Sequence, residues 1–132
     1  MTDDFDRDLR RVLLQLIEAR EDRNDADKRL QEFRAAHKPP ERPGEFEGVD
    51  ALLDYHHRRQ GYEDPLKQRE RALKRAKKEY TDAADQIRLF LPDGVPLRYA
   101  YEGERSGLIG TEYVIARKQD EIVVESPSTA TN

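Results

Sequence analysis

The chain has 132 residues, of which 36% are hydrophobic and 39% are charged, and its formal net charge is −4. A typical soluble domain is closer to half apolar and a quarter charged, so we expect elongated helices or subunit association rather than one thick core. The absence of cysteine excludes disulfides, thiolate metal sites and cysteine nucleophiles. The N-terminus is acidic and no apolar stretch is long enough for a signal sequence or a membrane span, which predicts a cytoplasmic protein.

Apolar residues recur from Phe5 to His37 at alternating steps of four and three residues, and eight of these ten positions are apolar. This spacing keeps one seam of a helix against a partner helix, as in coiled coils. Leu13 and Ile17 widen the apolar strip near the start, where we expect the helix to meet more than one neighbour. The seam positions are Phe5, Leu9, Val12, Leu16, Ala19, Arg23, Ala26, Leu30, Phe33 and His37.

Three prolines and a glycine in HKPPERPG end this helix and predict a loop at residues 38–47. Residues 48–61 are predicted to form a short helix that Gly61 closes. Asp64 and Pro65 then supply an N-cap and a first-turn proline for the next helix. The sequence leaves open whether residues 48–61 are a separate helix or extend the next one.

A second heptad run extends from Leu66 to Phe90, and seven of its eight seam positions are able to pack. Two long helices joined by a proline-rich loop predict an antiparallel, coiled-coil-like hairpin over residues 1–91. The seam positions are Leu66, Arg69, Leu73, Ala76, Tyr80, Ala83, Ile87 and Phe90.

After LPDGVP the hydrophobic period changes to two residues, which predicts strands. Alternate residues from Val95 to Tyr101 share one apolar face, as in a one-sided edge strand. TEYVIARK is apolar on both faces and should be the central strand, and residues 119–120 reverse the chain into a third strand, EIVVES. We therefore predict an α+β protein whose three-stranded antiparallel meander, residues 92–127, packs on the helices or on a second subunit, with a flexible tail at 128–132.

No set of residues predicts catalysis, a cofactor or a metal site. His56 and His57 are adjacent, so on a helix they point about 100° apart and would need His37 or Asp54 to complete a metal site. The acidic residues at the start of the first helix alternate with basic ones, and the helix macrodipole favours acids there. The glycines between residues 103 and 110 lack the following helix and the Lys-Ser/Thr pair of a phosphate-binding loop.

The basic segment 67–78 has two interpretations. Its cations can pair with acids of the first helix, and Arg23 and Arg69 at seam positions would then fix the alignment of the hairpin. They can instead contact nucleic acid, although a spread around the helix and an acidic net charge argue against this. The acids are Glu18, Glu21, Asp22, Asp25 and Asp27. The candidate nucleic-acid contacts are Lys67, Arg71, Lys74, Arg75, Lys77 and Lys78.

The phrase EYVIARKQDEIVVESP, placed after a helical hairpin, resembles the β domain of Gre-type transcript-cleavage factors, whose coiled coil enters an RNA polymerase channel. The resemblance implies a polymerase-associated regulatory factor. The chain departs from that family because its hairpin turn, KPPERPGEFEG, lacks the acidic tip motif and its C-terminal part is too short for the complete β domain. No site residue is transferred from the family.

The seam periodicity favours a non-enzymatic protein–protein interaction or assembly module that acts through the helix seam and the sheet face. We expect a homo-oligomer, most simply a dimer, or a complex with another protein. The alternative is a nucleic-acid- or polymerase-associated factor that uses residues 67–78. Tyrosines are frequent interface anchors, although those of the sheet can also cover its own core. The predicted interface residues are Leu9, Val12, Leu16, Leu73, Tyr80, Ile87, Tyr99, Tyr101 and Tyr113.

Overall fold

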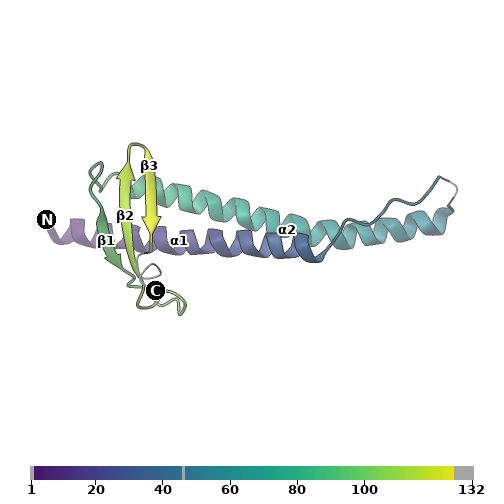
Figure 1. The fold of residues 1–132 in the computed structure, drawn as a ribbon, viewed down its shortest axis with the longest axis horizontal. Helices are drawn as coiled ribbons and strands as arrows, with labels where there is room; N and C mark the ends of the chain where they lie inside the picture. Colours follow the sequence, from purple (N-terminus) through teal and green to yellow (C-terminus); the bar gives the residue numbers. More distant parts are fainter. Residues whose placement is uncertain (1, 46, 127–132) are drawn as a thin grey trace. The chain divides into compact units, whose positions relative to one another are not determined.

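The computed structural model describes residues 2–45 and 47–126. Two long helices pack as a hairpin and are followed by a three-stranded antiparallel sheet (Figure 1). Helix α1 is Thr2–Ala36 and helix α2 is Val49–Ile87. The predicted α+β class and the order of its elements are therefore confirmed. The tail predicted at 128–132 lies outside the described residues.

Both predicted heptad seams are buried inside the chain. On α1, seam residues such as Val12, Leu16 and Leu30 are buried, whereas Phe5 is 54% exposed. His37 lies one residue beyond the end of the helix. Seven of the eight seam residues predicted for the second helix lie on α2 and are buried or half-buried, and Phe90, three residues beyond its end, is half-buried. The 3.5-residue period thus identified the inward face of both helices, because an apolar stripe of that period gains most by packing against a neighbouring element.

The connection between the helices differs in one respect from the prediction. Residues 37–45 and 47–48 form no helix or strand, as expected for the loop. Helix α2 continues without a break through Gly61 and Pro65, so residues 49–61 extend the second long helix, which is one of the two alternatives that the sequence left open, and Gly61 does not close a helix. Gly61 does not adopt the positive φ that a terminating glycine would have.

Packing against Phe33 of α1 explains why α2 remains helical through Pro65. The Phe33 ring centroid lies 5.8 Å from that of Tyr62, before the proline, and 4.7 Å from the guanidinium carbon of Arg69, after it. Arg69 Nη1 also donates a hydrogen bond of 3.1 Å to the Pro65 carbonyl. These contacts support helical geometry on both sides of Pro65, whose missing N–H would otherwise favour a break.

The sheet is a meander of three antiparallel strands in chain order, so the predicted central position of the second strand is confirmed. Tyr99 and Tyr113 are opposite each other in the register and are both buried, as the two-residue period predicts. Val95 precedes the first strand and is 53% exposed, so its predicted place on the buried face is wrong. The strands are β1 (Leu97–Ala100), β2 (Glu112–Lys118) and β3 (Glu121–Glu125).

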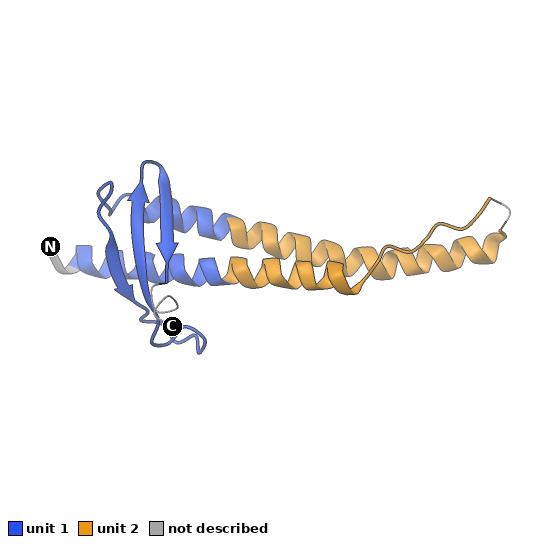
Figure 2. Ribbon diagram, viewed as in Figure 1, with its two compact units in different colours: residues 1–21, 78–132 blue, residues 22–77 orange. Residues whose placement is uncertain are grey.

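The chain divides into two compact units (Figure 2). Unit 1 comprises residues 1–21 and 78–132, and unit 2 comprises residues 22–77. Each unit contains a segment of both helices. The sheet therefore belongs to the same unit as one end of the hairpin.

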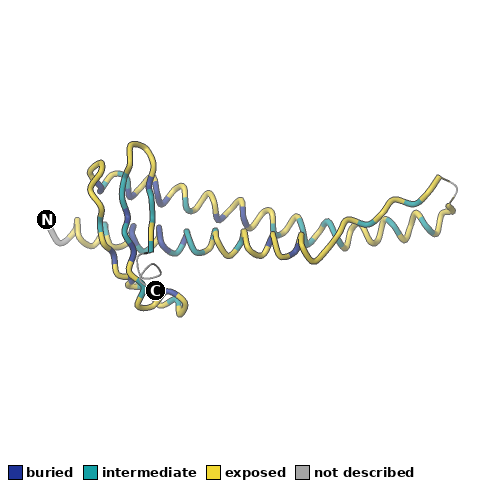
Figure 3. The backbone as a smooth tube through the Cα atoms, in the orientation of Figure 1, coloured by how far each residue is buried: buried dark blue, intermediate teal, exposed yellow. Residues whose placement is uncertain are grey.

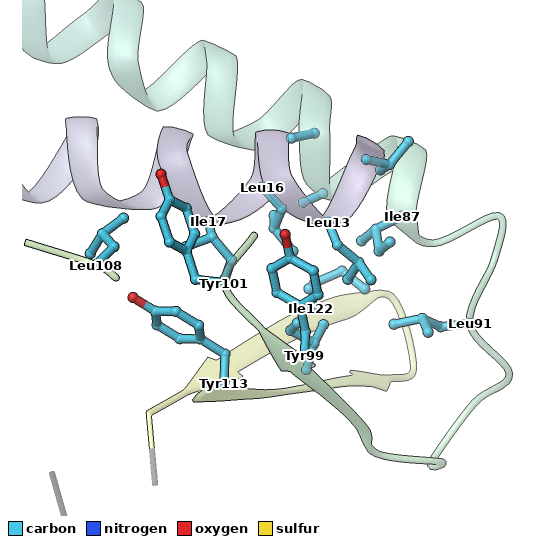
Figure 4. Close-up of a cluster of buried hydrophobic side chains, with 14 residues drawn as sticks. Leu13, Leu16, Ile17, Ile87, Leu91, Tyr99, Tyr101, Leu108, Tyr113 and Ile122 are labelled. Atoms are coloured by element: carbon cyan, nitrogen blue, oxygen red, sulfur yellow. The ribbon is translucent and has the colours of Figure 1, made fainter. Parts of the chain in front are cut away.

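The core of unit 1 lies where the sheet meets its helix segments (Figure 3). Figure 4 shows side chains from α1, α2 and the sheet converging there, and Leu16, Ile87 and Ile115 have no exposed surface. Arg10 of α1 also forms an ion pair with Glu102, which follows β1. The sheet face is thus covered by helices of its own chain. The buried cluster comprises Val12, Leu13, Leu16, Ile17, Ala83, Ala84, Ile87, Leu91, Tyr99, Tyr101, Leu108, Tyr113, Ile115 and Ile122.

Gln119, in the turn between β2 and β3, has a φ of 57°. This left-handed conformation is unfavourable for a residue with a Cβ atom. Two hydrogen bonds hold the turn: the Gln119 N–H donates to Asp93 Oδ1 at 2.8 Å, and Arg117 Nε donates to the Gln119 carbonyl at 3.1 Å. The loop before β1 is therefore tied to the hairpin and maintains the strained turn.

Gln119→Gly should raise the free energy of unfolding by about 0.5–1 kcal/mol, because glycine adopts this φ without strain and keeps both backbone hydrogen bonds. Urea unfolding followed by circular dichroism would measure the change. Asp120→Gly, at the next position of the turn, is the control and should not stabilise the protein. Destabilisation by Gln119→Gly would show that the left-handed conformation is not maintained in solution.

Candidate interaction surfaces

The histidines do not converge on one another. His56 and His57 are both exposed on α2, with ring centroids 6.1 Å apart. His37 stacks on Phe33 at 4.3 Å, and its Nδ1 lies 3.1 Å from the Phe33 carbonyl oxygen. In the described part of the chain, no three His, Cys, Asp or Glu side chains are grouped so that they could hold a metal ion.

Several acidic side chains form ion pairs within their own helix. On α1, Asp6 accepts a hydrogen bond of 3.1 Å from Arg10 Nε. On α2, Arg59 Nε donates to Glu63 at 2.7 Å, and this bond lowers the pKa of the Glu63 carboxyl. Both pairs join residues four apart in the sequence, which is the spacing that brings helix side chains together. Exposed pairs of this kind stabilise a helix only slightly.

The three tyrosines predicted for the interface, of which Tyr101 directly follows β1, belong to the core of unit 1. Tyr99 is 4% exposed, Tyr101 is 8% exposed and Tyr113 is 2% exposed. The Tyr101 hydroxyl accepts a 3.0 Å hydrogen bond from the backbone N–H of Arg105. Burial raises the pKa of Tyr99 and of Tyr113. Their side chains are therefore covered within the chain and leave little surface for a partner.

The predicted helix-seam interface is likewise occupied within the chain. Val12, Leu16, Leu73 and Ile87 are buried, and Leu9 and Tyr80 are half-buried. The heptad pattern could not distinguish an intramolecular partner from an intermolecular one, because both bury the same stripe. An interaction surface must therefore be sought among residues that the hairpin leaves exposed.

The six predicted cations of α2 are all exposed. Lys78 lies at the start of the segment that belongs to unit 1, and the others lie in unit 2. Lys74 and Lys77 line a groove of ≈ 440 Å³ in unit 2, whose other lining residues are Asp27, Leu30, Arg34, Glu70 and Leu73. Acidic and basic side chains of the two helices thus meet in this groove.

The first turns of α2 carry an exposed apolar surface that sequence reasoning missed. Val49 is 72% exposed, Leu52 is 58% exposed and Leu53 is 52% exposed. We call these three residues the α2 apolar face. The sequence placed them on a short helix, but it gave no indication that the face would lack a covering element.

The hairpin register explains why this face is open. Phe33, three residues before the end of α1, already packs on Tyr62 of α2. In an antiparallel pair, the residues of α2 that precede this contact soon extend beyond the end of α1. Figure 1 shows that only the connecting loop runs beside this part of α2. Ala51 and Tyr55, on another side of the helix, are half-buried, which leaves the α2 apolar face to solvent.

Comparisons with known proteins assign no function to the chain. No protein-family model matches it, and neither a curated protein nor a solved structure does. The resemblance of the strand sequence to Gre-type factors thus gains no support. Over the described residues, neither helix has the length and apolar composition needed to span a membrane.

Proposed function

We propose that this chain is a non-enzymatic protein–protein interaction module that self-associates through the α2 apolar face. The observation that carries the proposal is the exposure of Val49, Leu52 and Leu53, at 72%, 58% and 52%. Their spacing of three and four residues places them on one side of the helix, as in a helix that packs against another. Large apolar side chains gathered in this way are typical of interaction sites.

A second copy of the same segment is the partner that fits this surface. In an antiparallel pair related by a twofold axis, Leu52 and Leu53 of one copy would lie against the same residues of the other. Asp50 and His57 are seven residues apart and therefore share one flank of the helix. In an antiparallel pair, the flank of one helix faces the same flank of the other helix. Asp50 of each copy would therefore lie beside His57 of the other copy and could accept a hydrogen bond from it.

Three apolar side chains form a small surface, so we expect a dimer that dissociates on dilution. Sedimentation velocity over a series of concentrations should give a reversible monomer–dimer equilibrium for the wild type. Leu52→Glu with Leu53→Glu should raise the dissociation constant at least about tenfold, because two leucines per copy lose their burial. Circular dichroism would verify that both proteins remain equally helical.

Leu89→Glu is the matched control, since Leu89 is 87% exposed but lies in unit 1. This variant should dimerise like the wild type. A wild type that stays monomeric at every concentration would contradict self-association. Loss of the dimer in Leu89→Glu but not in the double variant would assign the interface to a different surface.

The arrangement of the two copies can be tested separately because the chain contains no cysteine. Leu53→Cys introduces a single thiol close to the expected twofold axis, where two Cβ atoms approach closely enough for a disulfide. Mild oxidation should therefore yield a covalent dimer of Leu53→Cys and leave Leu89→Cys monomeric. Equal cross-linking of both variants would show that the thiols meet only by random collision.

A further inference from the structure

Four exposed cations of α2 lie along one side of the helix within unit 2. Lys67, Arg71, Lys74 and Arg75 occupy positions i, i+4, i+7 and i+8, which share one helix face. We call them the basic strip. Leu73, on the opposite side, is buried. Lys77 is also exposed but lies off this face, so the exposed cations keep part of the expected spread around the helix.

The other cations of the segment lie outside the strip. Arg69 is turned toward α1, where its guanidinium carbon lies 4.7 Å from the centre of the Phe33 ring. Lys77 is exposed and, together with Lys74 of the strip, lines a groove that also contains acidic side chains. Lys78 is exposed as well but belongs to unit 1.

The protein neutralises the basic strip only in part, since the charge of Lys67 contributes to lowering the pKa of the Glu63 carboxyl. Among the described residues, no carboxylate oxygen lies within the 4.0 Å ion-pair distance of the four cations. Lys67 and Arg71, like Arg71 and Arg75, are four residues apart, and like charges at that spacing repel each other. A polyanion that binds along the strip would relieve this repulsion.

We infer that the basic strip binds the phosphate backbone of double-stranded nucleic acid without reading its sequence. From Lys67 to Arg75 the strip is about 12 Å long, which corresponds to roughly three or four successive phosphates of one strand. Arg71 and Arg75 can each contact a phosphate through two N–H groups. The exposed neighbours of the strip, Gln68 and Ala72, add no bulky side chain that would hinder approach.

The composition of the strip favours a duplex over two other polyanionic surfaces. Proteins that bind single strands use aromatic side chains on which bases stack, and the strip contains no aromatic residue. Helices that bind membrane surfaces insert an apolar face, whereas residues 67–78 include no exposed large hydrophobic side chain. Contact with phosphates alone predicts binding that is independent of sequence and steeply dependent on salt.

The test is fluorescence anisotropy with a labelled 20-base-pair DNA duplex of arbitrary sequence. The full chain should bind at 50 mM salt and lose roughly 100-fold in affinity by 200 mM, as expected for about four phosphate contacts. Neutralising the strip with Lys67→Gln, Arg71→Gln, Lys74→Gln and Arg75→Gln should weaken binding at 50 mM salt at least about 30-fold and flatten the salt dependence.

The matched control removes four other exposed cations of unit 2 and has the same net charge: Lys28→Gln, Arg29→Gln, Lys38→Gln and Arg42→Gln. Its affinity should remain within about threefold of the wild type. Equal loss in both variants, or no binding by the wild type at 50 mM salt, would overturn the inference. Binding to vesicles that contain anionic lipid, without binding to the duplex, would also overturn it and assign the strip to membranes.

Discussion

Ile87→Ala should lower the free energy of unfolding by about 3 kcal/mol, one of the largest effects expected for a single substitution in this chain. Ile87 has no exposed surface and belongs to the core that α1, α2 and the sheet form in unit 1. Alanine would remove three carbon atoms and leave a cavity between elements that are held on several sides. Urea unfolding followed by circular dichroism would measure the loss.

Leu89→Ala provides the comparison, because Leu89 is two residues away and 87% exposed. Its substitution should change the free energy of unfolding by less than about 0.5 kcal/mol. The contrast therefore tests burial rather than hydrophobicity, since both substitutions shorten a large aliphatic side chain. Similar losses in the two variants would contradict the assignment of Ile87 to the core.

The helical part of the fold could be predicted because its signal is repeated. Each heptad of α1 and α2 indicates the same inward face of its helix. The one exposed position near the end of α1, Phe5, therefore does not change the predicted face. The sequence leaves the continuity of the helix at Gly61 and Pro65 open for the opposite reason. Local preferences there favour a break, and they are outweighed by tertiary contacts of Phe33 with Tyr62 and Arg69.

The strands could be predicted from their two-residue period, but the element that covers their buried face could not. Tyr99 and Tyr113 were assigned to one face, and the structure places both on it. Whether that face meets a partner or the chain's own helices depends on contacts between residues distant in sequence. A pattern with a period of two residues contains no information about those contacts.

The two surfaces proposed for binding also depend on tertiary structure. The α2 apolar face is open because Phe33 pairs with Tyr62 near the end of α1, and the sequence does not specify this register. The basic strip could have been found from the sequence, since its residues follow helical spacing. The packing of Arg69 on Phe33, which keeps this cation out of the strip, is a contact between helices that the sequence does not specify.

Gly103→Ala should lower the free energy of unfolding by about 1–3 kcal/mol because it overfills a closely packed site. A Cβ atom at this position would lie 2.5 Å from Tyr101 Cζ and 2.9 Å from Leu14 Cδ1, closer than non-bonded carbon atoms approach. The Tyr101 ring cannot easily move away. It is 8% exposed, and its hydroxyl donates to Glu18 at 3.3 Å and accepts from the Arg105 N–H at 3.0 Å.

Gly107→Ala separates this steric effect from a general effect of replacing glycine in the same loop. A Cβ atom at Gly107 would meet no atom within 4 Å, so the variant should be as stable as the wild type or slightly more stable. Adding Leu14→Ala to Gly103→Ala should cost less than Leu14→Ala costs in the wild type, because it removes one of the two clashing groups. A double-mutant cycle in urea measures that difference. Strictly additive losses would show that the methyl group introduced by Gly103→Ala does not contact Leu14.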